Sequence, residues 1–460
     1  MGDLLRFAWP SIASFVCNSA YRVNDQFWVG GLGASAQAAL AACTFVMILN
    51  FGVYFLVVAG TLPQIARATG AGDIEGRHSI AAAATSLQVS IGLVQGVLGW
   101  FAAPWIAQVL GLEGAVAAQA TEYLQTGFLF CVPMGLAALV DNLFFGIGDT
   151  RTPLILQMLA ICINFVVNPI FVYGTNPIEG FDLLRSGTGE PWLGISGAAM
   201  ATGLSRATAA SLGLFLLYRV HGLRWWPKQR PRVQRLLRIL ALGWPSALSV
   251  GIYAGVYFAM LRIVFEPLPS TVMAGFGLGF NAFEGIAFPF YLGLSVAGAS
   301  LVGRCLGAGD VQATRTAVRN VRIAGLTLGI LFASVFYFLG PILVPLFTTD
   351  AEVVAAATLY VTVLGASQIF VALESVSEKI LLGAGLTRPI FWISVPGNLA
   401  RLPAAWFLAL HVGWGAAGIW WAINITTAIK ALAFHLLVST EPWTEQAQPG
   451  TGAGAKADAP

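Results

Sequence analysis

The sequence predicts an all-α integral membrane protein, with twelve transmembrane helices arranged as two parallel-repeat six-helix lobes around a central cavity. Hydrophobic residues make up 57% of the 460 residues, charged residues only 10%, and the mean hydropathy is +0.77. Soluble domains contain about 25% charged residues, so this composition excludes an ordinary soluble protein. The apolar residues form twelve segments, and motifs of the first six segments recur in the last six.

Each apolar segment has the length that a membrane-spanning helix requires. The first segment follows MGDLLRF directly and has no small-residue cleavage site after a short core, so we expect a membrane helix and not a removable signal peptide. The predicted segments are approximately 7–30, 37–62, 79–104, 121–146, 153–174, 193–219, 239–265, 270–302, 320–347, 353–383, 389–411 and 414–438.

The two halves of the chain contain the same short motifs in the same order. Because six helices per half is an even number, both halves enter the membrane in the same direction, and such parallel repeats place a substrate site between two bundles near the midplane. We expect an N-lobe of residues 1–222, a C-lobe of residues 223–440 that begins with a basic linker, and a disordered tail of residues 441–460. The repeated motifs are Trp9-Pro10-Ser11 with Trp244-Pro245-Ser246, Gly70-Ala71-Gly72-Asp73 with Gly307-Ala308-Gly309-Asp310, Gly146-Ile147-Gly148 with Gly383-Ala384-Gly385, and Gly197-Ala198-Ala199 with Gly415-Ala416-Ala417.

Positive charges gather in the loops on one side of the predicted bundle. The opposite loops carry only Arg185, so the positive-inside rule places both termini and the basic loops in the cytosol. Asp73 and Asp310 are expected to cap the helices that follow the GAGD loops. The basic loops contain Arg67, Arg77, Arg151, Arg219, Arg224, Lys228, Arg230, Arg232, Arg235, Arg238, Arg304, Arg315, Arg319, Arg322 and Arg388.

The first segment carries a polar stripe, because Ser11, Ser14, Asn18, Arg22 and Asp25 lie three or four residues apart on an apolar helix. An ionised Asp facing lipid costs about 2.5–3.5 kcal/mol on insertion scales, so Asp25 is expected to point into a bundle interior or a water-filled cavity. If Arg22, one turn earlier, pairs with Asp25, the carboxylate stays ionised and the stripe is structural or forms a gate.

The motifs carry a resemblance to a known family. They are Asp25 in NDQFWVGGLG, the two GAGD loops, GIGDTRTPL from Gly146 to Leu154, Asn168-Pro169-Ile170-Phe171, and GISGAAMAT from Gly194 to Thr202. In this order within a twelve-helix double repeat, they resemble the multidrug and toxic compound extrusion (MATE) family. The resemblance implies two lobes facing each other across a cavity, and export of organic, often cationic compounds in exchange for H⁺ or Na⁺.

In the N-lobe, Asp25 is expected to be joined by Asn164 and Asn168, which lie four apart on one helix face, and by Thr202. A family branch with its ion site in this lobe usually has an Asp at the position matching Asn168. That difference leaves Asp25 as the single acid at the matched positions, so proton coupling stays possible, whereas a Na⁺ site at Asp25, Asn164, Asn168 and Thr202 would lack further carboxylates.

In the C-lobe, three glutamates are candidates for the ion-coupling and substrate cavity. Asn281 and Glu284 share a face of a glycine-rich helix, and Glu374 and Glu378 lie four residues apart, so all three acids can face one cavity wall. Repeat alignment places Asp141 opposite Glu378, each five residues before a GxG loop, where a helix-end gate or cap is an alternative to ion binding. Desolvation favours the neutral form of such carboxyl groups, which is the minimum requirement for proton coupling.

The expected function is secondary-active antiport by a rocking carrier of the bacterial inner membrane. We expect a small-molecule organic substrate and surrounding lipid as partners, no nucleic acid, a functional monomer, and no cofactor apart from H⁺ or Na⁺ as coupling ion. A flippase of a lipid-linked precursor is the closest alternative, although such proteins usually have extra helices and a cationic cavity. An integral membrane transferase needs clustered Asp ligands for Mg²⁺-diphosphate, and no DDxxD-like cluster is present. A channel would not require buried acids in both halves.

Overall fold

A computed structural model describes residues 2–174, 192–227 and 232–444, and within these ranges the chain is helical without strands. The all-α, twelve-span fold is therefore confirmed. In the N-lobe the spans are α1 (Gly2–Gly30), α2 (Ala34–Gly70), α3 (Ile74–Val109), the pair α4 (Gly114–Leu129) and α5 (Cys131–Ile147), α6 (Arg151–Tyr173) and α8 (Gly194–Arg219).

The spans of the C-lobe contain several short π-helical or 3₁₀ turns. They are α9 (Val233–Met260) with η1 (Leu261–Phe265), α10 (Ser270–Leu278) with η2 (Gly279–Glu284) and α11 (Gly285–Gly307), α12 (Val311–Ser334) with η3 (Val335–Leu339), α13 (Gly340–Leu343) and η4 (Val344–Leu346), α14 (Ala351–Gly383), α15 (Thr387–Trp406) with η5 (Phe407–His411), and α16 (Ala416–Ser439).

Nine helices in the described residues are long and apolar enough to cross a membrane, and the α4–α5 pair, bent by 54°, gives a tenth span. The bend follows from Pro133, which lacks an N–H group and whose ring would clash with the carbonyl of Leu129 in a continuous helix. Two further long helices, α1 and α15, are not among these ten, because they carry more polar residues. Several helices continue past the predicted segments, as α2 does to Gly70, because their ends are polar and extend beyond the apolar zone.

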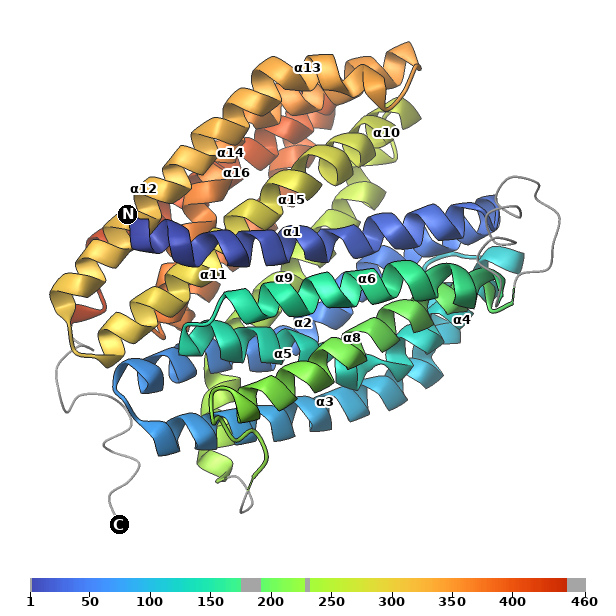
Figure 1. Cartoon of the computed structure of the whole chain (residues 1–460). Helices are drawn as coiled ribbons and strands as arrows, with labels where there is room; N and C mark the ends of the chain where they lie inside the picture. Colours follow the sequence, from blue (N-terminus) through green and yellow to red (C-terminus); the bar gives the residue numbers. More distant parts are fainter. Residues whose placement is uncertain (1, 175–191, 228–231, 445–460) are drawn as a thin grey trace.

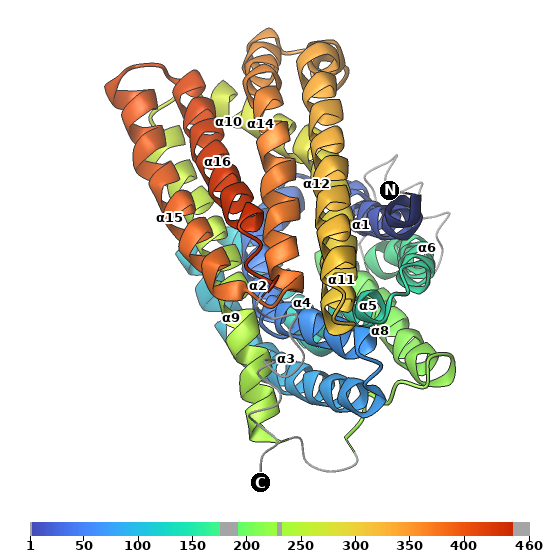
Figure 2. The ribbon, with the colours of Figure 1, turned by 90° about the vertical axis from the view of Figure 1, so that its left-hand side faces the viewer.

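The two halves of the chain form two lobes that pack against each other through their first two spans (Figures 1 and 2). The contacts are reciprocal: α1 packs along α11 of the C-lobe, and α2 packs along α9. This is the relation that a parallel duplication predicts, because the first span of each repeat meets the second span of the other.

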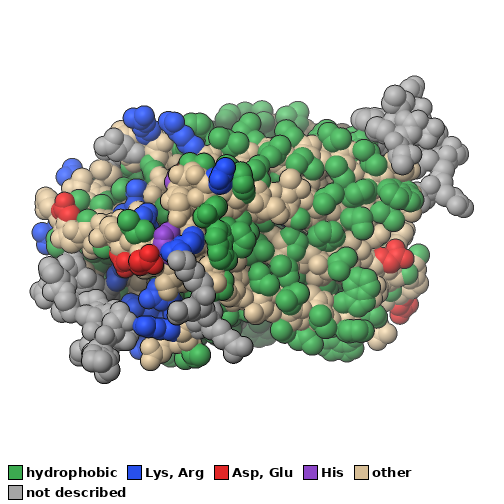
Figure 3. Space-filling model, turned by 60° about the horizontal axis from the view of Figure 1, so that its bottom comes forward, with side chains coloured by type: hydrophobic (Ala, Val, Ile, Leu, Met, Phe, Trp, Pro, Cys, Tyr) green, Lys and Arg blue, Asp and Glu red, His purple; other side chains and the backbone are tan. Residues whose placement is uncertain are grey.

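Lys and Arg side chains gather at one end of the molecule, which we call the basic end, while apolar side chains cover its middle (Figure 3). The expected caps are confirmed there, since the Asp73 carboxylate accepts from the Gly76 N–H and the Asp310 carboxylate accepts from the Ala313 N–H, both at 2.8 Å. Each cap satisfies an amide that the first turn of a helix leaves without a partner.

At the basic end, the lobes approach so closely that the contact requires glycine. A Cβ atom on Gly70 would lie 1.9 Å from the carbonyl oxygen of Arg304, and one on Gly307 would lie 2.1 Å from that of Arg67. The Arg67 guanidinium also donates to the carbonyl of Ala384 in the C-lobe. The two GAGD motifs therefore form a reciprocal seal between the lobes.

Away from the basic end, the lobes diverge. Along α2 and α9, a Cβ on Gly60 would lie 2.0 Å from the carbonyl oxygen of Ile239, whereas one on Gly52 would meet Val250 only at 3.4 Å. Further along α9, a Cβ on Gly251 or Gly255 would have nothing within 4 Å. The structure is thus closed at the basic end and open toward the other end.

Two expectations need correction. The cysteines are scattered through apolar segments, which predicts that they are buried. Cys162 of α6 is instead exposed, because α6 turns this face away from the lobe interior. The C-terminal tail also begins later than expected. Trp443 is 1% exposed and packs in the C-lobe core, since burying its large apolar ring system is favourable. Residues 445–460 lie outside the described part of the chain.

Candidate functional site

Three helices of the N-lobe, α1, α6 and α8, bring a group of polar side chains together around Asp25. Asn168 of α6 donates to Asp25 Oδ1 at 2.7 Å, and Thr202 of α8 lies 3.2 Å from both carboxylate oxygens. Asn164 donates to the Thr202 hydroxyl at 3.0 Å. Asp25 is only 7% exposed, and both Asn side chains are fully buried. We call Asp25, Asn164, Asn168 and Thr202 the N-lobe cluster; it consists of the four residues that the sequence grouped together.

The hydrogen bonds of the N-lobe cluster all run toward the carboxylate. Trp28 Nε1 donates to Asn24 at 2.9 Å, and Asn24 Nδ2 donates to Asn164 Oδ1 at 2.7 Å, from where the chain continues through Thr202 to Asp25. These hydrogen bonds fix the orientation of the Asn side-chain amides, with each NH₂ group pointing toward the next acceptor on the way to Asp25. The environment is built to stabilise negative charge at Asp25 without a direct ion pair.

One acceptor of the cluster is unused. Asn168 Oδ1 is buried and has no hydrogen-bond partner among the described residues. Together with the Asp25 carboxylate and the Thr202 hydroxyl, it offers oxygen atoms of the kind that hold a proton or a small hard cation. However, no group of three or more His, Cys, Asp or Glu side chains in the described part of the chain could hold a metal ion. The donor set therefore contains one carboxylate and neutral oxygens only.

Arg206 connects two further predicted residues to this lobe. One of its nitrogens donates to Gln157 Oε1 at 2.9 Å, and the other donates to Asn18 Oδ1. Gln157 in turn donates to Asp141 Oδ2 at 2.7 Å, so Asp141 faces the lobe interior through an amide. The guanidinium also lies 4.2 Å from the ring centroid of Tyr21. Asn18 and Asp141 thus belong to a second network beside the N-lobe cluster.

Arg22 does not pair with Asp25. It is exposed, and among the described residues no ion pair joins the two; its guanidinium instead lies beside α11 of the C-lobe, where a Cβ on Gly285 would be 3.4 Å from Arg22 Nη2. The polar stripe of α1 therefore divides between several neighbours. Ser11, at its beginning, donates to the carbonyl of Gly293 in α11 at 2.7 Å and helps to join the lobes.

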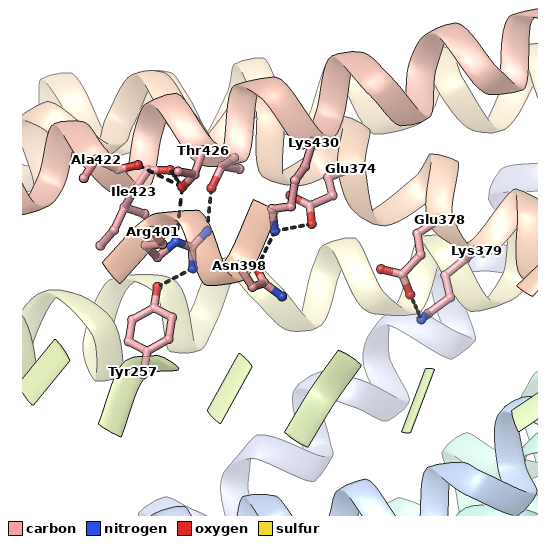
Figure 4. Close-up of polar contacts among 11 residues, drawn as sticks. Tyr257, Glu374, Glu378, Lys379, Asn398, Arg401, Ala422, Ile423, Thr426 and Lys430 are labelled. Atoms are coloured by element: carbon pink, nitrogen blue, oxygen red, sulfur yellow. Dashed lines mark hydrogen bonds and ion pairs between the residues drawn. The ribbon is translucent and has the colours of Figure 1, made fainter. Parts of the chain in front are cut away.

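In the C-lobe, basic side chains that the sequence pattern did not single out dominate the polar interior (Figure 4). Arg401 is 2% exposed and donates to three hydroxyl groups: Tyr257 at 3.2 Å, Thr426 at 3.3 Å and Thr427 at 3.0 Å. No carboxylate pairs with it directly in the described residues. Arg401 is the counterpart of Asn164 at an offset of 237 residues, so the two lobes differ in charge at matched positions.

Each of the acids at residues 374 and 378 already has a cationic partner. Lys430, 4% exposed, donates to Glu374 Oε1 at 2.7 Å and to Asn398 Oδ1 at 2.9 Å, and Lys379 donates to Glu378 Oε1 at 2.6 Å (Figure 4). The two carboxylates point to different ammonium groups and not to one shared wall. The helix periodicity placed them on one face but could not show these partners.

Glu284 ends the π-helical turn η2 in the glycine-rich span. Its carboxylate accepts from the Tyr360 hydroxyl and lies in the electrostatic field of Arg401. Asn281 does not join Glu284: it is exposed and donates to the carbonyl of Gly277 at 2.8 Å. The insertion of an extra residue per turn in a π-helical segment rotates side chains relative to an ordinary α-helix, which separates these two.

The sequence pattern assigned no site role to Asn24, Gln157, Arg206, Arg401 or Lys430. A signal existed for Arg206, because it lies four residues after Thr202 on the same helix face. Asn24 and Trp28 have the same spacing on α1. Lys430 was recognisable as an ionisable side chain within an apolar helix. Its partners Glu374 and Asn398 could not be predicted, because they lie on two other helices.

The Glu374–Lys430 pair yields a testable prediction about stability. Removing one member of a buried ion pair costs about 3–5 kcal/mol, because the remaining charge is left without a partner. We expect Glu374→Gln to lower the thermal unfolding temperature of the purified protein, and Glu374→Gln/Lys430→Gln to recover much of the loss. Glu378→Gln, whose partner is more exposed, is the matched control; an equal loss in that variant would contradict this assignment.

Comparisons with known proteins agree with the geometry. A family model named MatE matches residues 10–170 and 245–407. A probable multidrug resistance protein NorM of Thermotoga maritima is 25% identical over 458 residues, covering 97% of this chain and 93% of the relative. One of Agrobacterium fabrum is 29% identical over 470 residues, covering 94% and 93%. A solved outward-facing structure of a multidrug resistance MATE family transporter superposes with a TM-score of 0.87 at 20% identity, covering 97% and 96%.

Proposed function

Because the chain belongs to the MATE family of transporters, we propose that it exports organic, often cationic compounds across the bacterial inner membrane in exchange for protons. Members of this family are transport proteins and not enzymes. The observation that carries the proposal is the N-lobe cluster: a buried carboxylate, held by Asn168 and Thr202, inside one lobe of a duplicated bundle.

The duplicated fold supports alternating access. The lobes meet in a glycine seal at the basic end and diverge toward the other end, so rocking them in the opposite sense exposes the space between them to the opposite side. By the positive-inside rule, the basic end and both termini are cytosolic. The structure then represents a state that is closed to the cytosol, from which substrate leaves and into which the coupling ion enters.

Two observations favour the proton over Na⁺. The N-lobe cluster contains one carboxylate, and the C-lobe acids Glu374 and Glu378 are already neutralised by Lys430 and Lys379. In addition, Asn168 Oδ1 is an unused acceptor next to Asp25, available to the O–H group of a protonated carboxyl. Protonation at Asp25 would remove the negative charge that holds a cationic guest, and by reciprocity the guest weakens proton binding equally.

The test is transport by the purified protein in proteoliposomes. Uptake of a fluorescent organic cation is measured under an imposed pH gradient and, in separate vesicles, under an imposed Na⁺ gradient. We expect accumulation with the pH gradient alone. Accumulation that requires Na⁺ would exclude proton coupling, and a lack of accumulation under both gradients would contradict the antiport proposal. Vesicles without protein provide the baseline for leakage.

A further inference from the structure

A pocket of about 410 Å³ lies on the outer flank of the C-lobe, near the basic end and away from the N-lobe cluster. Its walls come from α12 and α16, and Leu373 of α14 contributes to its lining. Figure 2 shows α14 between α12 and α16, so the pocket is a groove over α14. The transport cycle proposed above makes no use of this groove.

Along α12, the groove changes from charged to apolar. Arg315, Arg319, Arg322 and Leu326 are spaced by four, three and four residues and therefore form one stripe of the helix. At a rise of about 1.5 Å per residue, this stripe runs about 16 Å from the basic end toward the middle of the span. Beside it, Ile323 is 42% exposed on the outer surface, where the helix faces lipid. A phospholipid has the same order, with a charged headgroup followed by acyl chains.

The charges in the groove are not balanced within the described residues. Arg315 pairs with Glu441 at 2.8 Å. Arg322 instead contacts the imidazole of His435 at 2.8 Å and the hydroxyl of Ser439 at 3.2 Å, neither of which carries a negative charge. Arg319 is exposed and has no ion-pair or hydrogen-bond partner in the described chain. Two guanidinium groups therefore lack a counter-ion within this part of the chain.

A second, independent observation comes from Trp443, which also lines the groove. Its side chain is 1% exposed, yet its indole N–H has no hydrogen-bond partner among the described residues. Buried indole N–H groups normally find an acceptor. A ligand with phosphate or ester oxygens in the groove would supply one.

We propose that this groove binds one anionic phospholipid of the leaflet at the basic end. Its phosphate lies between Arg319 and Arg322, where planar guanidinium groups form bidentate, charge-assisted hydrogen bonds. An acyl chain follows Leu326 and Leu373 into the membrane, and the indole N–H of Trp443 donates to a headgroup or ester oxygen. Basic pockets between transmembrane helices on the cytoplasmic side are suited to anionic headgroups.

The experiment is native mass spectrometry of the full-length protein released from detergent micelles. The probes are phosphatidylglycerol, phosphatidylcholine with the same acyl chains, and inorganic phosphate as a competitor. The test variant is Arg319→Gln/Arg322→Gln. The control variant Arg151→Gln/Arg388→Gln removes the same total charge from two exposed arginines at the basic end outside the groove. Trp443→Phe, which keeps a smaller aromatic ring and removes the N–H, is a milder second variant.

We expect wild-type protein to retain one phosphatidylglycerol with a clear preference over phosphatidylcholine. Each interfacial Arg contributes about fivefold, so the double variant is expected to bind about thirtyfold more weakly, while the control variant binds like wild type. Equal retention of both lipids, or equal weakening in the control variant, would overturn the proposal. Complete displacement by inorganic phosphate would show that the groove takes a free phosphate and no lipid. If the double variant does not fold, the other two measurements decide. Undiminished phosphatidylglycerol binding by Trp443→Phe, together with equal retention of phosphatidylglycerol and phosphatidylcholine by the wild type, would contradict the proposal.

Discussion

Asp25→Asn is expected to abolish gradient-driven export while leaving the protein folded and inserted. Asparagine has nearly the same shape, and its carbonyl oxygen still accepts from Asn168 or Thr202, so the hydrogen-bonded cluster survives. What is lost is the ability to alternate between a charged and a neutral form. The measurement is fluorescent-cation accumulation in proteoliposomes under a pH gradient, together with the amount of protein inserted.

Drug-binding affinity provides a second measurement on the same variant. In the wild type, affinity for a cationic compound is expected to fall as the pH is lowered, because protonation removes the negative charge of the N-lobe cluster. Asp25→Asn resembles the protonated form, so its affinity should be low and independent of pH. Glu284→Gln makes the matched change in the C-lobe; if that variant loses transport and Asp25→Asn keeps it, the coupling site is in the C-lobe.

The second large effect is expected at the glycine seal. Gly70→Ala and Gly307→Ala each place a methyl group about 2 Å from a carbonyl oxygen of the other lobe, far inside contact distance. Relieving such a clash costs about 1–3 kcal/mol per site, and the cost falls only on the state that is closed at the basic end. The double variant should therefore shift toward the state that is open to the cytosol and transport at least about tenfold more slowly.

Cys305, next to the seal on α11, can report the shift directly. In a background in which the other four cysteines are replaced, a membrane-impermeant maleimide applied from the cytosolic side should label Cys305 faster in the double variant than in the parent. Gly251→Ala is the control, because a Cβ there meets nothing within 4 Å. Unchanged labelling together with unchanged transport would show that the seal does not govern access.

The N-lobe cluster shows which site residues helix periodicity can predict. Asn164 and Asn168 lie four residues apart, so they must share a face of α6, and an acid at Asp25 cannot face lipid. Those two constraints place the residues inside the bundle, and the resemblance to the MATE family implied that they belong to one group. Arg206 shows the limit of periodicity: its side chain reaches Asn18 on α1 and Gln157 on α6, and the choice of those partners depends on how three helices are rotated about their axes.

The C-lobe was harder to predict for the same physical reason. Glu374, Glu378 and Glu284 were grouped because each can face inward, but a sequence pattern defines a face and not the neighbour across from it. Lys430 reaches Glu374 from a helix 56 residues further along the chain. The π-helical turn at Gly279–Glu284 also changes the angle around the helix axis between Asn281 and Glu284, and no spacing rule predicts such a turn.

The sequence by itself determined the membrane class, the number of spans, the duplication and the location of positive charge, because all four depend on the solvent in which each segment must lie. Only the tertiary structure decided that Asp25 is held by neutral donors while Glu374 and Glu378 are held by lysines. It also decided that the two GAGD motifs meet each other across the lobes. Such contacts depend on helix rotation, tilt and approach to within a few ångströms, which a one-dimensional pattern does not encode.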